Sequence, residues 1–158
     1  MTNVNADKQT VSVDRIFDAP RDLVFQAYTD PKQIPHWWGP RNLTTIVDKL
    51  EAKVGGTWRF LNRDKDGNEF GFHGVYHEVT ASERIVSTFE FEGLPGNVLL
   101  EAIIFEALPD GRTRIIGKGT SIFTSDEARD KMMNTGMEEG AKETWDRFAE
   151  LLATLQTT

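Results

Sequence analysis

Residues 137–155 read MEEGAKETWDRFAELLATL, which is the clearest helical pattern in the chain. Apolar side chains recur along this stretch at intervals of four, four, three, four and three residues: Met137, Ala141, Trp145, Phe148, Leu152 and Leu155. That spacing places them on one face of a long helix, while charged residues occupy much of the remaining surface. A helix with two such different faces must bury its apolar stripe against a large partner.

The segments that precede this helix supply the partner, because they alternate between strand-like runs and turn residues. The predicted strands are 10–17, 43–50, 56–63, 69–80, 84–92, 97–108 and 112–123. Asp66-Gly67 and Pro109-Asp110-Gly111 are typical of hairpin turns, in which glycine supplies a positive φ. Strands joined by such short loops pair antiparallel, so the pattern predicts a meander.

Helix-starting signals appear at three places outside the long helix. Pro20 and the pair Asp30-Pro31 predict two short helices between the first two strands. A capping box from Thr124 to Glu127 predicts another short helix, and Gly136 predicts a break before the long one. The order of elements predicts an α+β fold: a curved six- to seven-stranded antiparallel sheet wrapped around the long C-terminal helix.

Length and composition limit the possible functions. The chain has 158 residues, which is the usual size of one domain, and we expect a flexible tail over residues 1–9 and a single domain over 10–158. A net charge of −7 argues against nucleic-acid binding, which needs clustered Lys and Arg. The absence of cysteine excludes disulfides and thiolate chemistry. The apolar stretch 98–108 is interrupted by Glu101 and Glu106, and residues 1–9 lack the apolar core of a signal peptide, so we expect no membrane insertion and a cytoplasmic protein.

Four segments together resemble a known family. They are Asp18-Ala19-Pro20 with Val24-Phe25; Trp37-Trp38-Gly39-Pro40; 54–60 (VGGTWRF) followed by 74–79 (GVYHEV) and 83–86 (ERIV); and 136–140 (GMEEG) with Trp145. In this order, over residues 10–155, they resemble the activator-of-heat-shock-ATPase homologues, a branch of the START-like (SRPBCC) superfamily that includes the birch pollen allergen. The resemblance implies a helix-grip fold with an internal hydrophobic cavity, and it leaves the reaction open.

The first functional prediction is a binder of a small apolar molecule, lipid-like or aromatic, held without catalysis in a pocket of ~300–1,000 Å³ between sheet and helix. Methionines near the helix start favour this prediction, since flexible thioethers adapt to irregular ligands. Trp37 and Trp38 either line the cavity mouth or anchor a loop. The candidate lining residues are Trp38, Phe60, Phe72, Tyr76, Phe89, Phe105, Met133, Met137 and Trp145.

Two alternatives stay open. One is an enzyme of polyketide-cyclase or hydrolase type in the same cavity, with Glu90, Glu101 or Tyr76 as the acid–base group; an inward carboxyl with a strongly shifted pKa would favour it. The other is a chaperone-interacting module linked to the stress response, which requires an exposed apolar patch. The eukaryotic activators carry an additional amino-terminal domain, for which we expect no room in this chain.

No cofactor and no metal site are predicted. His73 and His77 lie on one predicted strand, where four residues separate them by roughly 13 Å, too far to share one ion easily. His36 belongs to a distant loop. The pattern leaves the oligomeric state open between a monomer and a homodimer.

Overall fold

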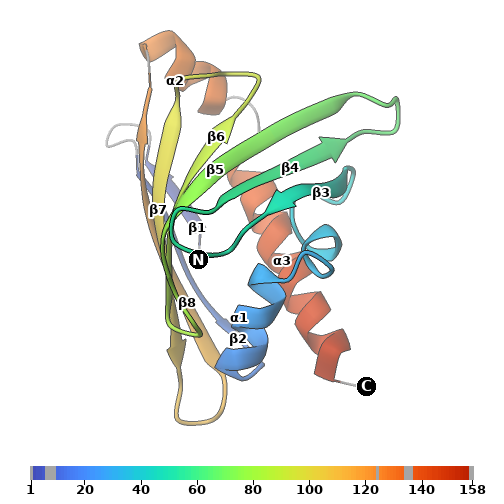
Figure 1. The fold of residues 1–158 in the computed structure, drawn as a ribbon, viewed down its shortest axis with the longest axis vertical. Coiled ribbons are helices and arrows are strands. Elements are labelled where there is room, and N and C mark those ends of the chain that lie inside the picture. The colour runs from blue at the N-terminus through green and yellow to red at the C-terminus, as the bar shows by residue number, and fades with distance from the viewer. Residues whose placement is uncertain (1, 6–9, 124, 134–136, 157–158) are drawn as a thin grey trace.

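The computed structural model describes residues 2–5, 10–123, 125–133 and 137–156, and it shows one antiparallel sheet that curls around helices (Figure 1). The strands are β1 (Thr2–Asn5), β2 (Thr10–Phe17), β3 (Thr44–Leu50), β4 (Thr57–Arg63), β5 (Glu69–Thr80), β6 (Arg84–Phe91), β7 (Val98–Ala107) and β8 (Thr113–Ile122). The helices are α1 (Arg21–Thr29), the short 3₁₀ helix η1 (Ile34–His36), α2 (Asp126–Met133) and α3 (Met137–Gln156). The spatial order of strands is β1-β2-β8-β7-β6-β5-β4-β3.

The predicted α+β class and the wrapping of the sheet around the last helix are confirmed (Figure 1). Each of the seven predicted strands is present with its ends shifted by at most one residue. Gly67 and Gly111, with φ of 85° and 86°, occupy hairpin turns as predicted. Local turn chemistry and strand periodicity therefore determine most of the sheet.

The sheet has one strand more than predicted. Thr2–Asn5 form β1, which pairs antiparallel with β2 so that Thr2 lies opposite Val13. The prediction of a tail over residues 1–9 is thus corrected for residues 2–5. It rested on their polar composition, whereas a ladder at the sheet edge is made by backbone hydrogen bonds that need no apolar side chain.

The second of the two predicted short helices is shorter than expected. It is reduced to the three residues of η1, after a turn in which the Asp30 carbonyl accepts hydrogen bonds from Gln33 and Ile34. Pro35 is the reason, because a residue before proline is disfavoured in the α conformation and proline itself has no N–H to donate. Thr124 of the predicted capping box and the predicted break at Gly136 lie outside the described residues.

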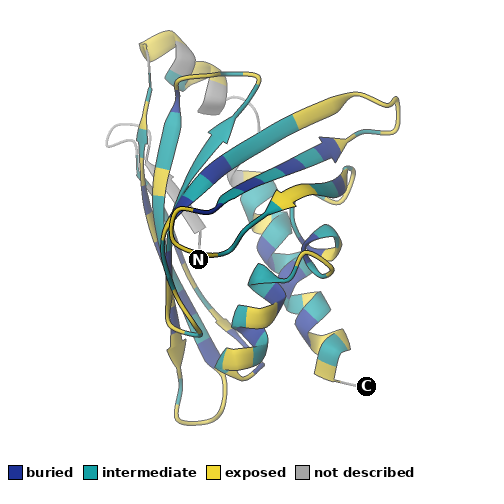
Figure 2. Cartoon of the chain, in the orientation of Figure 1, coloured by how far each residue is buried: buried dark blue, intermediate teal, exposed yellow. Residues whose placement is uncertain are grey.

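The core lies between α3 and the inner face of the sheet (Figure 2). Trp145, Phe148 and Leu152 of the predicted stripe are buried, while Ala141 and Leu155 are half-buried. The ring centroids of Trp145 and Phe17 on β2 are 6.0 Å apart, which places Trp145 at the helix–sheet interface as the stripe predicts.

Arg147 ties α3 to η1 and to the segment that follows it. Its guanidinium donates hydrogen bonds to the carbonyls of Gly39 at 2.7 Å, Trp38 at 3.3 Å and Pro35 at 3.4 Å. Desolvation lowers the pKa of this half-buried side chain from its usual value. The connection holds the loop that carries the two adjacent tryptophans against the helix.

Candidate functional site

A small cavity of about 70 Å³ lies between the inner face of the sheet and the α1–η1 segment. Tyr28 comes from α1, Trp37 and Trp38 follow η1, and the remaining walls come from β4 to β7. The lining is aromatic at seven of nine positions: Tyr28, Trp37, Trp38, Trp58, Phe60, Tyr76, Ser87, Phe89 and Glu101. This set is called the aromatic pocket below.

Trp37 and Trp58 each donate their indole N–H to a backbone carbonyl. Trp37 Nε1 donates to the Ala27 carbonyl at 3.1 Å, and Trp58 Nε1 donates to the Thr88 carbonyl at 3.2 Å. Trp58 reaches that carbonyl by passing over Gly74, where an added Cβ would lie 2.5 Å from its Nε1. These bonds fix the rings in place.

The carbonyl of Trp38 is held as well, by the buried Thr45 hydroxyl at 2.6 Å and by Arg147. The Trp38 ring packs edge-on against Phe60 and Phe72, at centroid distances of 5.1 and 5.2 Å. Trp38 is half-buried and Trp37 is only 3% exposed. Both alternatives for this pair therefore apply: Trp37 anchors the loop, and both rings line the pocket.

Glu101 is the one acidic side chain in the pocket. It shares the inward face of β7 with Ile103 and Phe105, because alternate residues of a strand point to the same side. Its neighbours across the sheet are Gly119 on β8 and Ser87 on β6, neither of which fills the space beside the carboxyl. Glu101 is half-buried, and it contributes to the lining of both this cavity and the groove on the outer face of the sheet, where Gly119 beside it has no side chain.

Burial raises the pKa of Glu101 to about 7. No hydrogen bond from a described residue reaches this carboxyl, so nothing in that part of the chain offsets its loss of hydration. Burial also raises the pKa of Tyr76 and, together with the Glu101 charge, that of Tyr28, so both phenols are neutral near pH 7.

Two of the three acid–base candidates of the enzyme alternative lie in the pocket, and the third does not. Glu101 and Tyr76 line the aromatic pocket. Glu90 does not: its carboxylate accepts a hydrogen bond from the Gly96 N–H at 2.7 Å and lies 3.3 Å from His73 Nε2. Glu101 thus meets the condition set by the sequence, an inward carboxyl with a strongly shifted pKa.

Of the predicted lining residues, Trp38, Phe60, Tyr76 and Phe89 are brought together in the pocket. Phe72 stands behind Trp38 and Phe89, at 5.2 and 5.4 Å. Phe105 and Trp145 pack against Tyr28, at 5.5 and 6.2 Å, and so support the wall without lining it. The side chains of Met133 and Met137 lie outside the described residues. Ligand binding by any of these residues stays a prediction.

The predicted lining set omits five residues that line the pocket: Tyr28, Trp37, Trp58, Ser87 and Glu101. Glu101 had a signal in the sequence, since it interrupts an apolar run and shares strand parity with Ile103 and Phe105. Tyr28 and Ser87 had no such signal in the sequence, because only the packing of α1 against the sheet brings them into the same cavity.

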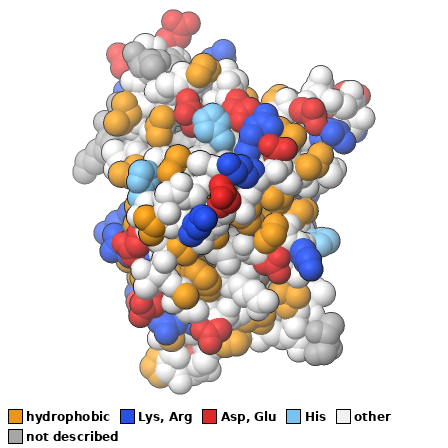
Figure 3. Space-filling model, in the orientation of Figure 1, with side chains coloured by type: hydrophobic (Ala, Val, Ile, Leu, Met, Phe, Trp, Pro, Cys, Tyr) orange, Lys and Arg blue, Asp and Glu red, His pale blue; other side chains and the backbone are white. Residues whose placement is uncertain are grey.

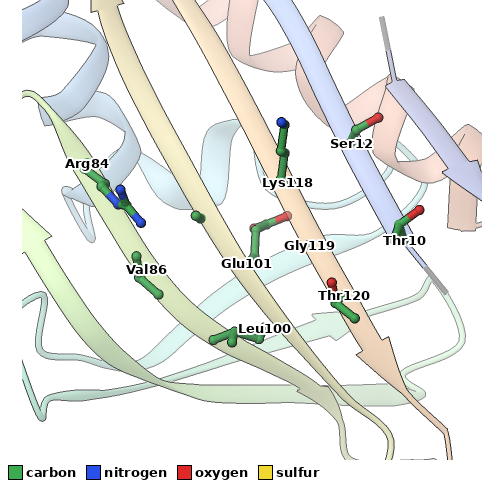
Figure 4. A pocket seen from close by; sticks show the side chains of 10 residues that line it. Thr10, Ser12, Arg84, Val86, Leu100, Glu101, Lys118, Gly119 and Thr120 are labelled. Atoms are coloured by element: carbon green, nitrogen blue, oxygen red, sulfur yellow. The ribbon is translucent and has the colours of Figure 1, made fainter. Parts of the chain in front are cut away.

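A larger groove, of about 510 Å³, lies on the opposite, outer face of the sheet. Figure 4 shows the Lys118 and Thr120 side chains on β8 beside Ser12 and Thr10 on β2. Most of its lining positions are those whose side chains alternate away from the core, and Leu100 is 51% exposed there. The groove contains no aromatic residue and its cations, Arg84 and Lys118, are exposed. We therefore take the aromatic pocket as the candidate site.

A cluster of titratable side chains on the outer face also joins β4, β5 and Glu92, the residue that follows β6. Arg59 donates two hydrogen bonds to Glu92, at 2.8 and 2.9 Å, and His73 Nδ1 lies 2.9 Å from the same carboxylate. Arg59 first and His73 second lower the pKa of Glu92 to about 2. Basic and acidic side chains are interspersed in this way over the visible surface (Figure 3). Among the described residues no group of three or more His, Cys, Asp or Glu is arranged to hold a metal ion.

Comparison with known proteins identifies the family. The model of the family described as Activator of Hsp90 ATPase homolog 1-like protein matches residues 18–153. The chain belongs to this family. The resemblance inferred from the four sequence segments is therefore confirmed, and with it membership of the START-like group with a helix-grip type of fold.

Solved structures support the same fold. A solution NMR structure of a protein from Arthrobacter aurescens is 24% identical with a TM-score of 0.85, covering 98% of this chain and 91% of that chain. A crystal structure of a protein from Mycobacterium smegmatis is 25% identical with a TM-score of 0.79, covering 96% and 95%. One from Rhodobacter sphaeroides is 19% identical with a TM-score of 0.82, covering 98% of both chains. No curated protein matches the chain.

The fold of this family commonly binds ligands, and no particular ligand follows from the fold. In the part of this chain that the structure describes, no helix is both long enough and apolar enough to cross a membrane.

Proposed function

We propose that the chain binds a small molecule in the aromatic pocket, with Glu101 as the polar anchor. The observation that carries this proposal is that one carboxyl, without a hydrogen-bond partner among the described residues, lines a cavity together with seven aromatic side chains. Ligand sites are typically apolar cavities in which a few placed polar groups fix the orientation of the ligand.

The size of the cavity restricts the ligand. A cavity of ~150 Å³ holds benzene, so about 70 Å³ accommodates a ligand or ligand group of only a few non-hydrogen atoms. The pocket of ~300–1,000 Å³ that was expected for a lipid-like ligand is not formed, because Trp38, Phe60 and Phe89 fill the inner face of the sheet. A fatty ligand would enter only if these rings moved.

The test is a thermal-shift screen of small fragments, since a ligand that binds only the folded state raises the melting temperature by mass action. Ser87→Leu places a larger side chain in the aromatic pocket, and Thr120→Leu places the same side chain in the outer groove. We expect Ser87→Leu to abolish the ligand-induced rise, measured against its own unliganded melting temperature, and Thr120→Leu to retain it.

Loss of the ligand-induced rise in Thr120→Leu, with the rise retained in Ser87→Leu, would place the ligand in the outer groove and overturn the proposal. A screen without any stabilising fragment would overturn it as well. Quenching of tryptophan emission in the unmodified protein gives a second readout, because Trp37, Trp38 and Trp58 line the pocket.

A second candidate function is general acid–base catalysis at the same site. It is favoured by one observation, the pKa of about 7 at Glu101, since an acid–base catalyst is most efficient when its pKa lies near the working pH. Mass analysis of fragments incubated with the protein separates the two: unaltered fragments support binding alone, while conversion that Glu101→Gln abolishes supports catalysis. The chaperone-interacting alternative, the oligomeric state and the cytoplasmic location stay predictions.

A further inference from the structure

The aromatic pocket combines two kinds of group that favour positive charge. Trp37, Trp38 and Trp58 supply indole rings, whose faces carry the negative end of the ring quadrupole. Glu101 supplies a carboxyl, and no Lys, Arg or His belongs to the lining. The pocket therefore holds an acid that the described residues do not provide with a counter-ion.

Resting on the function proposed above, we propose that the natural ligand is a small organic cation of the methylated-ammonium class, held against the aromatic faces and neutralised by Glu101. Cations are attracted to the faces of Trp and Tyr, and cages of such rings recognise quaternary ammonium groups. A carboxylate among the same rings adds direct charge compensation, which is stronger in a partly desolvated site than in water.

Other ligand classes fit the pocket less well. An anion would face the Glu101 carboxylate, and a neutral apolar ligand would leave the charge of that carboxylate buried and uncompensated. A neutral ligand with a hydrogen-bond acceptor would pair with the protonated acid only. The three classes therefore differ in charge and in the protonation state of Glu101 that each selects.

The size of the cavity, about 70 Å³, restricts the cation to the smallest members of this class. Tetramethylammonium, with five non-hydrogen atoms, is the smallest quaternary ammonium ion and is therefore the probe. It carries a permanent charge and no N–H, so its own protonation state does not change with pH. tert-Butanol also has five non-hydrogen atoms and is neutral, so the two compounds form a pair matched in size.

The pH dependence follows from linkage. The cation selects the ionised carboxyl, so its affinity rises about tenfold per pH unit below the pKa of Glu101 and levels off above pH 7. The titratable groups that line the pocket with Glu101 are Tyr28 from α1 and Tyr76 from β5, and both stay neutral over this range. Ser87 on β6 and Gly119 on β8 do not titrate. On the other face of the sheet, Arg84 on β6 and Lys118 on β8 are the charged side chains that line the outer groove together with Glu101.

The experiment measures binding of tetramethylammonium and of tert-butanol by calorimetry or NMR titration, at pH 5.5 and pH 8. It uses the unmodified protein, Glu101→Gln and the control Glu106→Gln. Glu106 lies on the same strand but is exposed. We expect the unmodified protein and Glu106→Gln to prefer tetramethylammonium and to bind it more tightly at pH 8. In Glu101→Gln we expect its affinity at pH 8 to fall at least about tenfold and the pH dependence to disappear.

The outcomes distinguish a wrong ligand charge from the absence of any small-molecule binding. Binding of tert-butanol as tight as that of tetramethylammonium, or binding of the cation unchanged by Glu101→Gln, would overturn the cationic ligand and leave small-molecule binding standing. Failure of both compounds to bind, together with failure of the fragment screen, would remove the proposed function as well.

Discussion

Glu101 lies on a strand face that is otherwise apolar, and its carboxyl has a raised pKa because the fold buries it. Leu100 and Ile104, which alternate to the other side of the same strand, are 51% and 39% exposed, so the acid is inside while large apolar residues are outside. A position that disfavours folding in this way is the kind at which function, rather than stability, explains the residue.

The first prediction concerns this carboxyl. An ordinary Glu titrates near pH 4.3, so between about pH 4.5 and 7 the folded state binds more protons at Glu101 than the unfolded state does. Stability must therefore fall as the pH rises through this window, by on the order of 3 kcal/mol for this group. We expect urea unfolding at pH 5 and pH 8 to show a steeper loss for the unmodified protein than for Glu101→Gln.

Glu106→Gln is the matched control, and its pH dependence should follow that of the unmodified protein. Parallel pH profiles for the unmodified protein and Glu101→Gln would contradict burial of the charge.

At the scale of elements, α3 and the sheet meet through a small number of rings. Trp145 is 8% exposed, and its ring lies near those of Phe17, Phe148, Tyr28 and Trp37 at centroid distances of 5.9 to 6.3 Å. The last two of these line the aromatic pocket, so the helix supports one wall of the site without contacting the cavity itself.

We therefore predict that Trp145→Ala costs roughly 3–5 kcal/mol of unfolding free energy, the usual range for removing a buried large aromatic side chain. Lys142→Ala, at an exposed position of the same helix, should change stability by less than about 0.5 kcal/mol. Chemical denaturation measures both. A loss below about 1 kcal/mol for Trp145→Ala would show that this ring does not belong to the core.

At the scale of the whole molecule, the pocket depends on an interaction between segments more than a hundred residues apart. Arg147 on α3 holds the carbonyls of Pro35, Trp38 and Gly39, and the Thr45 hydroxyl on β3 also donates to the Trp38 carbonyl. The walls of the site are thus positioned jointly by the last helix, the loop after η1 and the sheet.

The third prediction is that Arg147→Lys weakens binding in the aromatic pocket although residue 147 does not line it. Lysine keeps the charge but lacks the planar fork that reaches several carbonyls at once. We expect a stability loss of roughly 1–3 kcal/mol, from carbonyls left without donors, and a raised dissociation constant for any pocket ligand. Arg41→Lys, at an exposed ion pair with Glu150, serves as the control and should change neither quantity appreciably. Unchanged ligand affinity in Arg147→Lys would show that the loop is held without this contact.

Much of the architecture could be predicted from local patterns. The seven strands of the meander, the turns at Gly67 and Gly111 and the buried stripe of α3 follow from side-chain period and turn chemistry, which act over a few residues. The family also follows from the sequence, because its four segments occur in order. Strand β1 and the reduction of the second short helix to η1 do not, since edge pairing and the effect of Pro35 compete with weak local signals.

The arrangement of the candidate site cannot be predicted from local sequence patterns. The alternation of β5 is interrupted by a bulge between Tyr76 and Glu78, which returns Val79 to the inner face and makes the facing of its residues unreadable from period alone. That Glu101 points inward beside Ser87 and Gly119, that Tyr28 crosses to meet it, and that the remaining space is only about 70 Å³ are consequences of packing between distant segments. The sequence determined the strands, turns, helical stripe and family through short-range periodicity and turn propensity. Only the tertiary structure decided which face each side chain takes and how much space the rings leave, because both depend on long-range register and on the filling of volume.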